Sequence, residues 1–172
     1  MPKHSFYDIQ SQLTLPFLSS HNEIIEEIFS ILEKEFGLIQ RSNQRFIDLG
    51  SGDGSVVIYS GVNYKIRSFG IEINQNLIKQ AKRSIKRLNW KTQRLIKIKR
   101  RDLFQQNLEQ FDFIYIFSLP SMHKFLLHVF KTAKKGAVII SYKYKLSYME
   151  ELLKPAHEAT FNDVNVFFYL KS

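Results

Sequence analysis

A glycine-rich turn directly after a short apolar segment constrains this chain more than any other feature. Residues 46–54 read FIDLGSGDG, so an apolar run reaches the acid Asp48 and then meets glycines at every second position, at Gly50, Gly52 and Gly54. Glycines at this spacing let the backbone turn sharply and lie close against a ligand. The pattern indicates a nucleotide-type cofactor site, and an ordinary tight loop is the alternative.

A second carboxylate favours the cofactor site. Residues 66–72 read IRSFGIE and are typical of a strand that ends at Glu72, 18 positions after Gly54. Nucleotide-binding folds place a ribose-binding acid roughly 20 residues after their glycines, because a helix and a strand lie between the two. The spacing here is G-x-G-x-G with an acid before it, whereas the dinucleotide fingerprint is G-x-G-x-x-G. A cofactor that carries an amino acid and a ribose, such as S-adenosylmethionine, suits this arrangement better than a pyrophosphate does.

Strand and helix patterns alternate from residue 45 onward, which predicts an α/β fold with a mostly parallel sheet and helices on both faces. Before them, a capping box at 20–23 opens a helix that Gly37 closes. The expected strands are 45–49, 66–72, 94–99, 111–117 and 137–143, and the expected helices are 54–62, 75–89, 104–110 and 121–134. A second capping box at 147–150 precedes an expected hairpin, with strands near 156–161 and 164–170 and a turn at Asn162-Asp163.

Length and composition limit what the chain can be. Its 172 residues suffice for one domain, which we divide into an arm and capping helix at 1–37 and a core at 45–172. The absence of cysteine excludes disulfides, thiolate zinc sites and a cysteine nucleophile, and the scattered histidines predict no metal site. No apolar run reaches the roughly 20 residues that span a bilayer. We therefore expect a cytoplasmic monomer that does not insert into a membrane.

The positive charge of the chain is concentrated in one block. Of its 25 Lys and Arg residues, eleven fall within residues 79–101, which contain no Asp or Glu, so the remaining 14 are matched against 16 acidic residues. Such a block could be a footprint for RNA or for an acidic protein surface. It could equally be the solvated face of a helix beside an edge strand that lysines protect from pairing. The sequence leaves both interpretations open.

Several motifs together resemble the class I S-adenosylmethionine-dependent methyltransferases: FIDLGSGDG, the acids in GIEIN and RRDLF, and the apolar strand FDFIYIF. Within that class, the stretches LPFLSS, YIFSLPSM and KKGAVIIS are similar to the archaeal protein-lysine methyltransferases and to relatives that methylate a lysine of the ATP synthase c-subunit. The resemblance implies a Rossmann-like fold whose seven strands take the order 3-2-1-4-5-7-6, with the last strand antiparallel.

The resemblance also implies which residues bind S-adenosylmethionine. The glycine loop would meet the methionine part, and the two later acids would accept hydrogen bonds from the ribose hydroxyls and the adenine amine. The implied cofactor-binding residues are Asp48, Gly50, Ser51, Gly52, Gly54, Glu72, Ile73, Asp102 and Leu103. For Asp102 the alternative is a helix N-cap, and a cap could serve both purposes.

The methyl acceptor would approach the end of the fourth strand. Methyltransferases that act on planar nitrogens carry an Asn-Pro-Pro-Tyr-like motif there, whereas residues 117–120 of this chain read FSLP, which weakens the case for an adenine or glutamine acceptor. A lysine acceptor needs instead a narrow apolar and aromatic channel for its stem. The expected catalytic positions are Phe117, Ser118 and Pro120, and the expected channel residues are Phe17, Ser19, Ser20 and Tyr142. Tyr144 is a further candidate for the channel wall, although ordinary packing in a strand explains it better.

The leading hypothesis is therefore a protein-lysine N-methyltransferase of broad specificity, with exposed lysines of several proteins as partners. The block at 79–101 motivates an RNA methyltransferase of the same fold as the alternative. A non-catalytic nucleotide-binding module is a third hypothesis, against which the complete set of acids and glycines counts.

Overall fold

Seven strands form one sheet in the order β3-β2-β1-β4-β5-β7-β6 in the computed structural model, which describes residues 22–172. The strands are β1 (Arg45–Leu49), β2 (Arg67–Glu72), β3 (Ile96–Arg100), β4 (Phe113–Ile116), β5 (Val138–Tyr142), β6 (Leu153–Phe161) and β7 (Val164–Lys171). The α-helices are α2 (Asn22–Phe36), α3 (Ser55–Tyr59), α4 (Gln75–Lys86), α5 (Trp90–Gln93) and α6 (His123–Lys131). Short turns of other helical types are η1 (Ser60–Tyr64), η2 (Leu103–Gln105) and η3 (Pro120–Met122).

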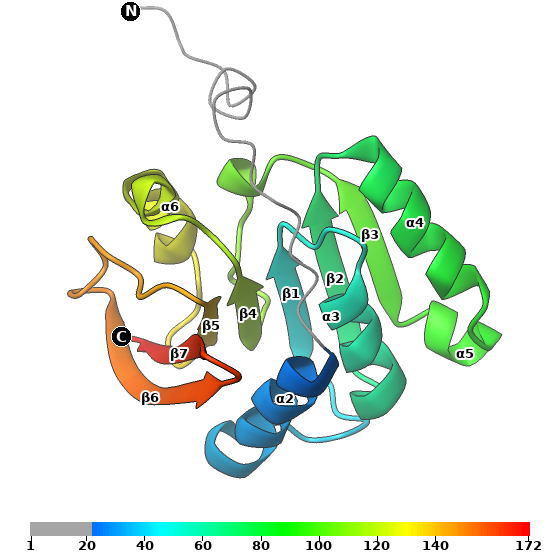
Figure 1. The fold of residues 1–172 in the computed structure, drawn as a ribbon, viewed down its shortest axis with the longest axis horizontal. Helices are drawn as coiled ribbons and strands as arrows, with labels where there is room; N and C mark the ends of the chain where they lie inside the picture. Colours follow the sequence, from blue (N-terminus) through cyan, green and yellow to red (C-terminus); the bar gives the residue numbers. More distant parts are fainter. Residues whose placement is uncertain (1–21) are drawn as a thin grey trace, which may run out of the picture.

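The sheet confirms the fold expected from the sequence. Neighbours among β1 to β5 pair in parallel, and β7 runs antiparallel to both β5 and β6. The arrowheads of β1, β2 and β4 point to the same edge of the sheet in Figure 1. The strand order reverses between β1 and β4, and ligands of open α/β sheets bind at that switch point, beyond the carboxyl ends of the strands. The topology therefore directs attention to the loops after β1, β2, β3 and β4.

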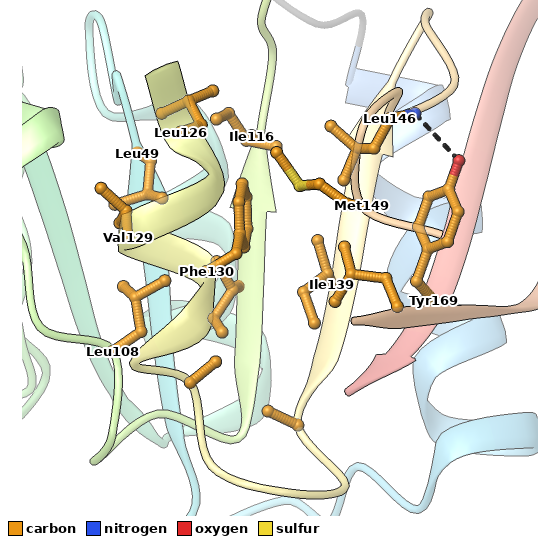
Figure 2. Packing of buried hydrophobic residues seen from close by; sticks show 14 of the residues in the cluster. Leu49, Leu108, Ile116, Leu126, Val129, Phe130, Ile139, Leu146, Met149 and Tyr169 are labelled. Carbon is orange, nitrogen blue, oxygen red and sulfur yellow. Dashed lines mark hydrogen bonds between the residues drawn. The ribbon is translucent and has the colours of Figure 1, made fainter. Parts of the chain in front are cut away.

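Alternate side chains of the strands supply two cores, one on each face of the sheet. On one face, α2 packs through Phe29 against Phe46 of β1, with ring centroids 5.3 Å apart. On the other face, α6 packs through Val129 and Phe130 against the interior of the sheet (Figure 2). The hydroxyl oxygen of Tyr169 accepts a hydrogen bond from the Leu146 amide at 3.0 Å and so fixes the loop after β5 to β7 (Figure 2). Both faces are covered, as a parallel sheet requires.

Several expected helix boundaries are wrong, each for a local reason. The helix expected over 75–89 ends at Lys86. A separate helix, α5, begins after Asn89, whose side chain accepts a hydrogen bond from the Thr92 amide at 3.0 Å and so caps the N-terminus of α5. The helix expected over 104–110 is one 3-10 turn, η2. The helix expected over 121–134 begins with the turn η3 and ends at Lys131.

The second capping box does not open a helix. Tyr148 adopts a φ of +66°, which interrupts a right-handed helix, and the Glu150 carboxylate accepts a hydrogen bond from the Tyr148 amide at 3.2 Å. The chain then enters β6 at Leu153, three residues before the expected start. Pro155 is tolerated there because β6 is an edge strand and its pairing with β7 is irregular between Pro155 and His157.

The C-terminal hairpin has the turn expected from the sequence. Asn162 and Asp163 both have positive φ, 47° and 64°, as a two-residue type I′ turn requires. Within residues 22–172, no helix is both long and apolar enough to cross a bilayer. Of the first capping box, Asn22 and Glu23 form the start of α2, whereas Ser20 and the arm before it lie outside the described residues.

Packing around Gly61 yields a stability prediction. A Cβ atom at Gly61 would lie 2.4 Å from Cγ1 of Ile96, so Gly61→Ala should destabilise the fold by about 1–3 kcal/mol through overpacking. Urea unfolding of Gly61→Ala, Ile96→Ala and the double variant measures the coupling between the two sites. The double variant should be less destabilised than the sum of the single variants. Strict additivity would contradict the contact.

Candidate functional site

The glycine loop between β1 and α3 is built from left-handed backbone. Gly50, Gly52 and Gly54 have φ values of +92°, +54° and +80°, a region that side chains strongly disfavour. The amides of Gly50 and Ser51 both donate to the Ile71 carbonyl, at 2.8 and 2.9 Å, and so hold the loop against the end of β2. The three glycines are therefore required by backbone conformation as well as by spacing.

The glycines differ in what surrounds them. A Cβ atom built at Gly50 would meet only the tip of Leu103, at 4.0 Å, so the loop is open on that side. At Gly54 the same atom would lie 3.0 Å from the Ala81 side chain, so this glycine lets α3 pack closely against α4. The open side of the loop faces Leu103, which follows β3. A ligand that lies along the loop at Gly50 would therefore reach the end of β3 as well.

The Glu72 carboxylate holds the glycine loop in place. Its Oε2 atom accepts from the Gly52 amide at 2.9 Å, and its Oε1 atom accepts from the amides of Ile73 and Asn74 at 2.8 Å each. Each carboxylate oxygen can accept two hydrogen bonds, so Oε2 keeps capacity for a further donor. Ribose binding by Glu72 stays a prediction. The sequence did not reveal that the same group also braces the loop.

Asp48 is a buried carboxylate that lacks a cationic partner. Its side chain is 3 % exposed, and its Oδ1 atom has no hydrogen-bond partner among the described residues. Burial raises the pKa of Asp48 well above its usual range, and the nearby carboxylates of Glu72 and Asp53 raise this pKa further. A buried acid in an acidic neighbourhood is costly unless a cation binds beside it. This site therefore suits a ligand with a positively charged group.

The end of β3 carries the acid that the sequence assigned to adenine. The Asp102 side chain accepts from the Phe104 amide at 2.8 Å and so caps the turn η2, which confirms the N-cap interpretation. The Arg101 amide donates to the Glu72 carbonyl at 3.1 Å, which brings this segment beside the end of β2. Asp102, Leu103 and Ile73 are all half-buried. Adenine binding by this group stays a prediction that its position at the strand ends favours.

Aromatic side chains gather where β4 and β5 end. The Phe117 ring packs edge-on against Tyr142 at 5.7 Å and lies parallel to the Tyr144 ring at 6.2 Å. Burial raises the pKa of the Tyr142 hydroxyl. We call Phe117, Tyr142 and Tyr144 the aromatic wall. It brings together three residues that the sequence proposed for a substrate channel, whereas Phe17, Ser19 and Ser20 lie outside the described residues.

Two buried polar atoms lie in the loop and helix that follow β4. The Ser118 hydroxyl is buried and has no hydrogen-bond partner among the described residues, and the same holds for Nε2 of the fully buried His123. Pro120, in contrast, is exposed and opens the turn η3. Unsatisfied buried polar groups are rare in folded proteins. Their presence in the segment that follows Phe117 indicates that this segment has a function beyond connecting β4 to α6.

Sequence reasoning missed His123. Its Nδ1 atom accepts from the Ser147 amide at 3.0 Å, so a neutral ring carries its proton on Nε2. Burial lowers the pKa of His123, and the nearby backbone of Ser118 raises this pKa by a smaller amount. The Ser118 backbone does not form a complete hydrogen bond with Nε2. The sequence gives no local signal for the contact between His123 and Ser147, because Ser147 lies 24 positions further along the chain. Among residues 22–172, no cluster of acids and histidines could hold a metal ion.

Several known proteins of similar structure are described as methyltransferases or methylases. An RNA methyltransferase from Salinibacter ruber, solved with S-adenosyl-L-homocysteine, superimposes with a TM-score of 0.76 at 20% identity, over 90% of this chain and 94% of that one. A putative methylase from Haemophilus influenzae gives a TM-score of 0.67 at 16% identity, over 87% and 96% of the two chains. A precorrin-6y C5,15-methyltransferase from Geobacter metallireducens gives 0.63 at 18% identity, over 93% and 94%. These likenesses show a shared fold. No curated protein matches the sequence.

The sheet order, the glycine loop and the acids at the strand ends define a class I S-adenosylmethionine-dependent methyltransferase. The chain belongs to the family of the ANTKMT methyltransferase domain, whose pattern matches residues 48–152. Its cofactor is S-adenosylmethionine. The residues present fit this cofactor. Oδ1 of the buried Asp48 has no partner among the described residues, and an amino-acid ammonium group would supply both a donor and a positive charge. The loop is also open at Gly50, where a ligand could lie.

Asp48→Asn tests this electrostatic fit. A carboxyl group whose folded pKa is raised favours folding below its unfolded pKa and loses that contribution as pH rises toward the folded pKa, so at pH 8 Asp48 destabilises the ligand-free fold. The variant should raise the melting temperature of the ligand-free protein at pH 8. It should also weaken S-adenosylmethionine binding about 10- to 150-fold, the equivalent of 1.5–3 kcal/mol for a charged hydrogen bond. Calorimetry measures both quantities.

Asp163→Asn is the matched control for that experiment, because it makes the same substitution at an exposed hairpin position whose positive φ Asn also adopts. Its effects on melting and binding should be small. An Asp48→Asn variant that melts lower at pH 8, or binds the cofactor as tightly as the parent protein, contradicts the assignment.

His123 predicts a pH dependence of stability. A histidine whose folded pKa is lowered contributes stability above its unfolded pKa, about 6.5, and that contribution is lost as pH falls toward the folded pKa. His123→Gln should therefore flatten the fall in unfolding free energy between pH 7 and pH 5. Urea titrations at several pH values measure this slope. His128→Gln, at an exposed position of the same helix, serves as the control, and equal slopes for both variants would refute the prediction.

Proposed function

We propose that this methyltransferase transfers methyl groups to lysine side chains of proteins, with broad selectivity. The observation that carries the proposal is an ammonium group already seated on the aromatic wall. Lys143 Nζ lies over the Tyr144 ring, 5.6 Å from its centroid, and the Phe117 ring lies parallel to the Tyr144 ring with centroids 6.2 Å apart. Aromatic faces attract cations with about 0.5–2 kcal/mol. A substrate lysine would find the same attraction at the end of β4.

The wall would also prepare a lysine for reaction. S-adenosylmethionine supplies a methyl group that its sulfonium centre makes electrophilic. The amine must lose one proton before it can attack, and transfer from water into an apolar channel lowers the pKa of an amine. Half-buried Phe117 and buried Tyr142 would exclude water from the lysine stem. Catalysis would then consist mainly of positioning, without a strong general base.

The loop after β4 supports lysine over planar nitrogen acceptors. Phe117-Ser118-Leu119-Pro120 offers no amide side chain that could hold an exocyclic amine in its plane. The Ser118 hydroxyl is the unpaired donor and acceptor closest in sequence to the wall, and it could accept a hydrogen bond from an attacking amine. We assign the acceptor side of the site to Phe117, Ser118, Tyr142 and Tyr144. Pro120 fixes the turn that follows.

A labelling experiment distinguishes the proposal from its alternative, an RNA methyltransferase. The purified protein is incubated with methyl-labelled S-adenosylmethionine and a cell extract, which is then divided between protease and nuclease digestion. Label that protease releases, located by mass spectrometry on lysines of several proteins, supports the proposal. Label in RNA would replace it with the alternative, and label on one lysine of one protein would overturn broad selectivity. No label in either fraction would favour a non-catalytic module.

Tyr144→Ala tests the aromatic wall. The variant should lower kcat/KM for protein substrates about 2- to 30-fold, equivalent to loss of 0.5–2 kcal/mol of cation–π attraction, and should leave the affinity for S-adenosylmethionine unchanged. Tyr148→Ala, which removes an exposed tyrosine outside the wall, is the control and should change neither quantity. A Tyr144→Ala variant with parental kcat/KM would remove the wall from the acceptor site.

A further inference from the structure

A strongly basic surface lies at the β3 end of the sheet, where α4, α5 and β3 lie together (Figure 1). All eleven Lys and Arg residues of the block at 79–101 are exposed, and no salt bridge is formed by any of them with the described residues. We call this set the β3-edge surface: Lys79, Lys82, Arg83, Lys86, Arg87, Lys91, Arg94, Lys97, Lys99, Arg100 and Arg101. Its charge is thus presented to solvent without an acidic residue of its own segment to balance it.

Stability alone does not explain this surface. Along α4, Lys79 and Arg83 are four residues apart, as are Lys82 and Lys86, and like charges at that spacing destabilise a helix. A helix face that only needs solvation alternates its charges, because opposite charges at the same spacing stabilise it. Protection of an edge strand needs one or two lysines, which Lys97 and Lys99 already supply. The uncompensated charge therefore indicates an anionic partner.

An exposed aromatic residue lies among these charges. Trp90 at the start of α5 is 62% exposed, although tryptophan is usually buried, and the cationic groups of Lys91 and Arg94 each lie 5.8 Å from its ring centroid. A flat ring flanked by cations matches the way proteins bind single-stranded nucleic acid, with a base stacked on the ring and phosphates paired with the cations. A nucleic acid combines a planar base with a phosphate in every nucleotide, a regular pairing that an acidic protein surface does not present.

The strand β3 extends the surface toward the cofactor site. Lys97 and Lys99 are two positions apart in the strand and so share one face of the sheet, about 7 Å from each other. It is the face opposite to α4, which packs on Ile96 and Ile98, so the cations of α4 and of β3 lie on the two sides of this edge strand. Arg100 and Arg101 follow at the carboxyl end, where the Arg101 amide donates to the Glu72 carbonyl. The cations therefore run from Trp90, before the start of β3, to the edge of the sheet that carries the cofactor loop. The aromatic wall lies on the other side of the switch point, after β4 and β5.

We propose that the β3-edge surface binds single-stranded nucleic acid, with one base stacked on Trp90 and the backbone phosphates on the lysines and arginines around it. The nucleic acid is a docking partner here and is not the methyl acceptor. The inference goes beyond lysine methylation and does not depend on it, because binding at this surface is measured without any methyl transfer.

Trp90 provides the measurement, because it is the only tryptophan in the sequence and its fluorescence reports on this surface alone. A twelve-nucleotide oligouridine should quench the fluorescence, and the logarithm of the binding constant should fall with the logarithm of salt concentration by about 0.7 for each phosphate contact. Oligothymidine in parallel shows whether the surface distinguishes RNA from DNA. Binding of either one supports the proposal, and quenching by neither overturns it.

Variants separate the stacking contact from general charge attraction. Trp90→Ala, followed by anisotropy of a labelled oligonucleotide, should weaken binding about 5- to 150-fold, as loss of one stacked base does. The triple variant Lys91→Ala, Lys97→Ala, Lys99→Ala should reduce the salt slope by about 2. The matched control Lys34→Ala, Lys135→Ala, Lys154→Ala removes the same charge from exposed positions elsewhere. If the control triple weakens binding as much as the first triple, binding follows net charge and the proposed surface is wrong.

Other anionic partners are excluded in the same titration. Polyglutamate and vesicles containing phosphatidylserine are added at equal charge. If either one quenches Trp90 as strongly as the oligonucleotide, the surface is a general anion or membrane site and the proposal fails. Methyl label that appears in the bound oligonucleotide would make nucleic acid the acceptor and would overturn its role as a docking partner.

Discussion

The Glu72 carboxylate holds the cofactor side of this protein together. It accepts hydrogen bonds from the Gly52 amide of the loop after β1 and from two amides that follow β2. A loop of three glycines has a large conformational entropy in the unfolded chain, and fixing it in left-handed conformations requires contacts of this kind. Charge-assisted hydrogen bonds to backbone amides are among the stronger ones available. A single side chain at the end of β2 thus orders the loop while its Oε2 atom keeps capacity for a further donor.

Negative charge is concentrated around the same loop, which favours binding of a cation at the expense of the stability of the ligand-free fold. Asp48 is buried beside Glu72 and Asp53, and all three repel one another when ionised. The ligand-free protein therefore carries an electrostatic cost at the point where we expect the ammonium group of the cofactor to bind. Functional sites commonly hold charged groups whose mutual repulsion a bound ligand reduces, and such groups have shifted pKa values. In this protein, the reduced repulsion around Asp48 would contribute directly to cofactor affinity.

The aromatic wall and the β3-edge surface differ in charge. The wall of Phe117, Tyr142 and Tyr144 is apolar and attracts one cation at a time, as shown by Lys143 over Tyr144. The β3-edge surface is cationic and repels a lysine side chain. Under the two proposals above, a lysine acceptor would be guided to the aromatic wall and a polyanion to the β3 edge. The switch point between β1 and β4 separates the two, with the cofactor loop between them.

The sequence by itself determined the fold class and the cofactor loop, because both depend on local patterns. Alternating apolar segments specify a parallel sheet, and the spacing of Gly50, Gly52 and Gly54 specifies backbone that only glycine readily adopts. Helix ends were predicted less well, since the side chain of Asn89 and the backbone of Tyr148 decide them through single contacts. Such contacts leave no periodic signal.

Only the tertiary structure decided which distant residues meet. His123 contacts Ser147 across 24 positions, and Phe117 meets Tyr144 because β4 and β5 are neighbours in the sheet. Asp48 Oδ1 and the Ser118 hydroxyl likewise have no hydrogen-bond partner among the described residues because they are buried, and burial is not encoded by the neighbouring sequence. Burial and pairing arise from packing over the whole chain, so the electrostatic character of the site could be found only in the folded structure.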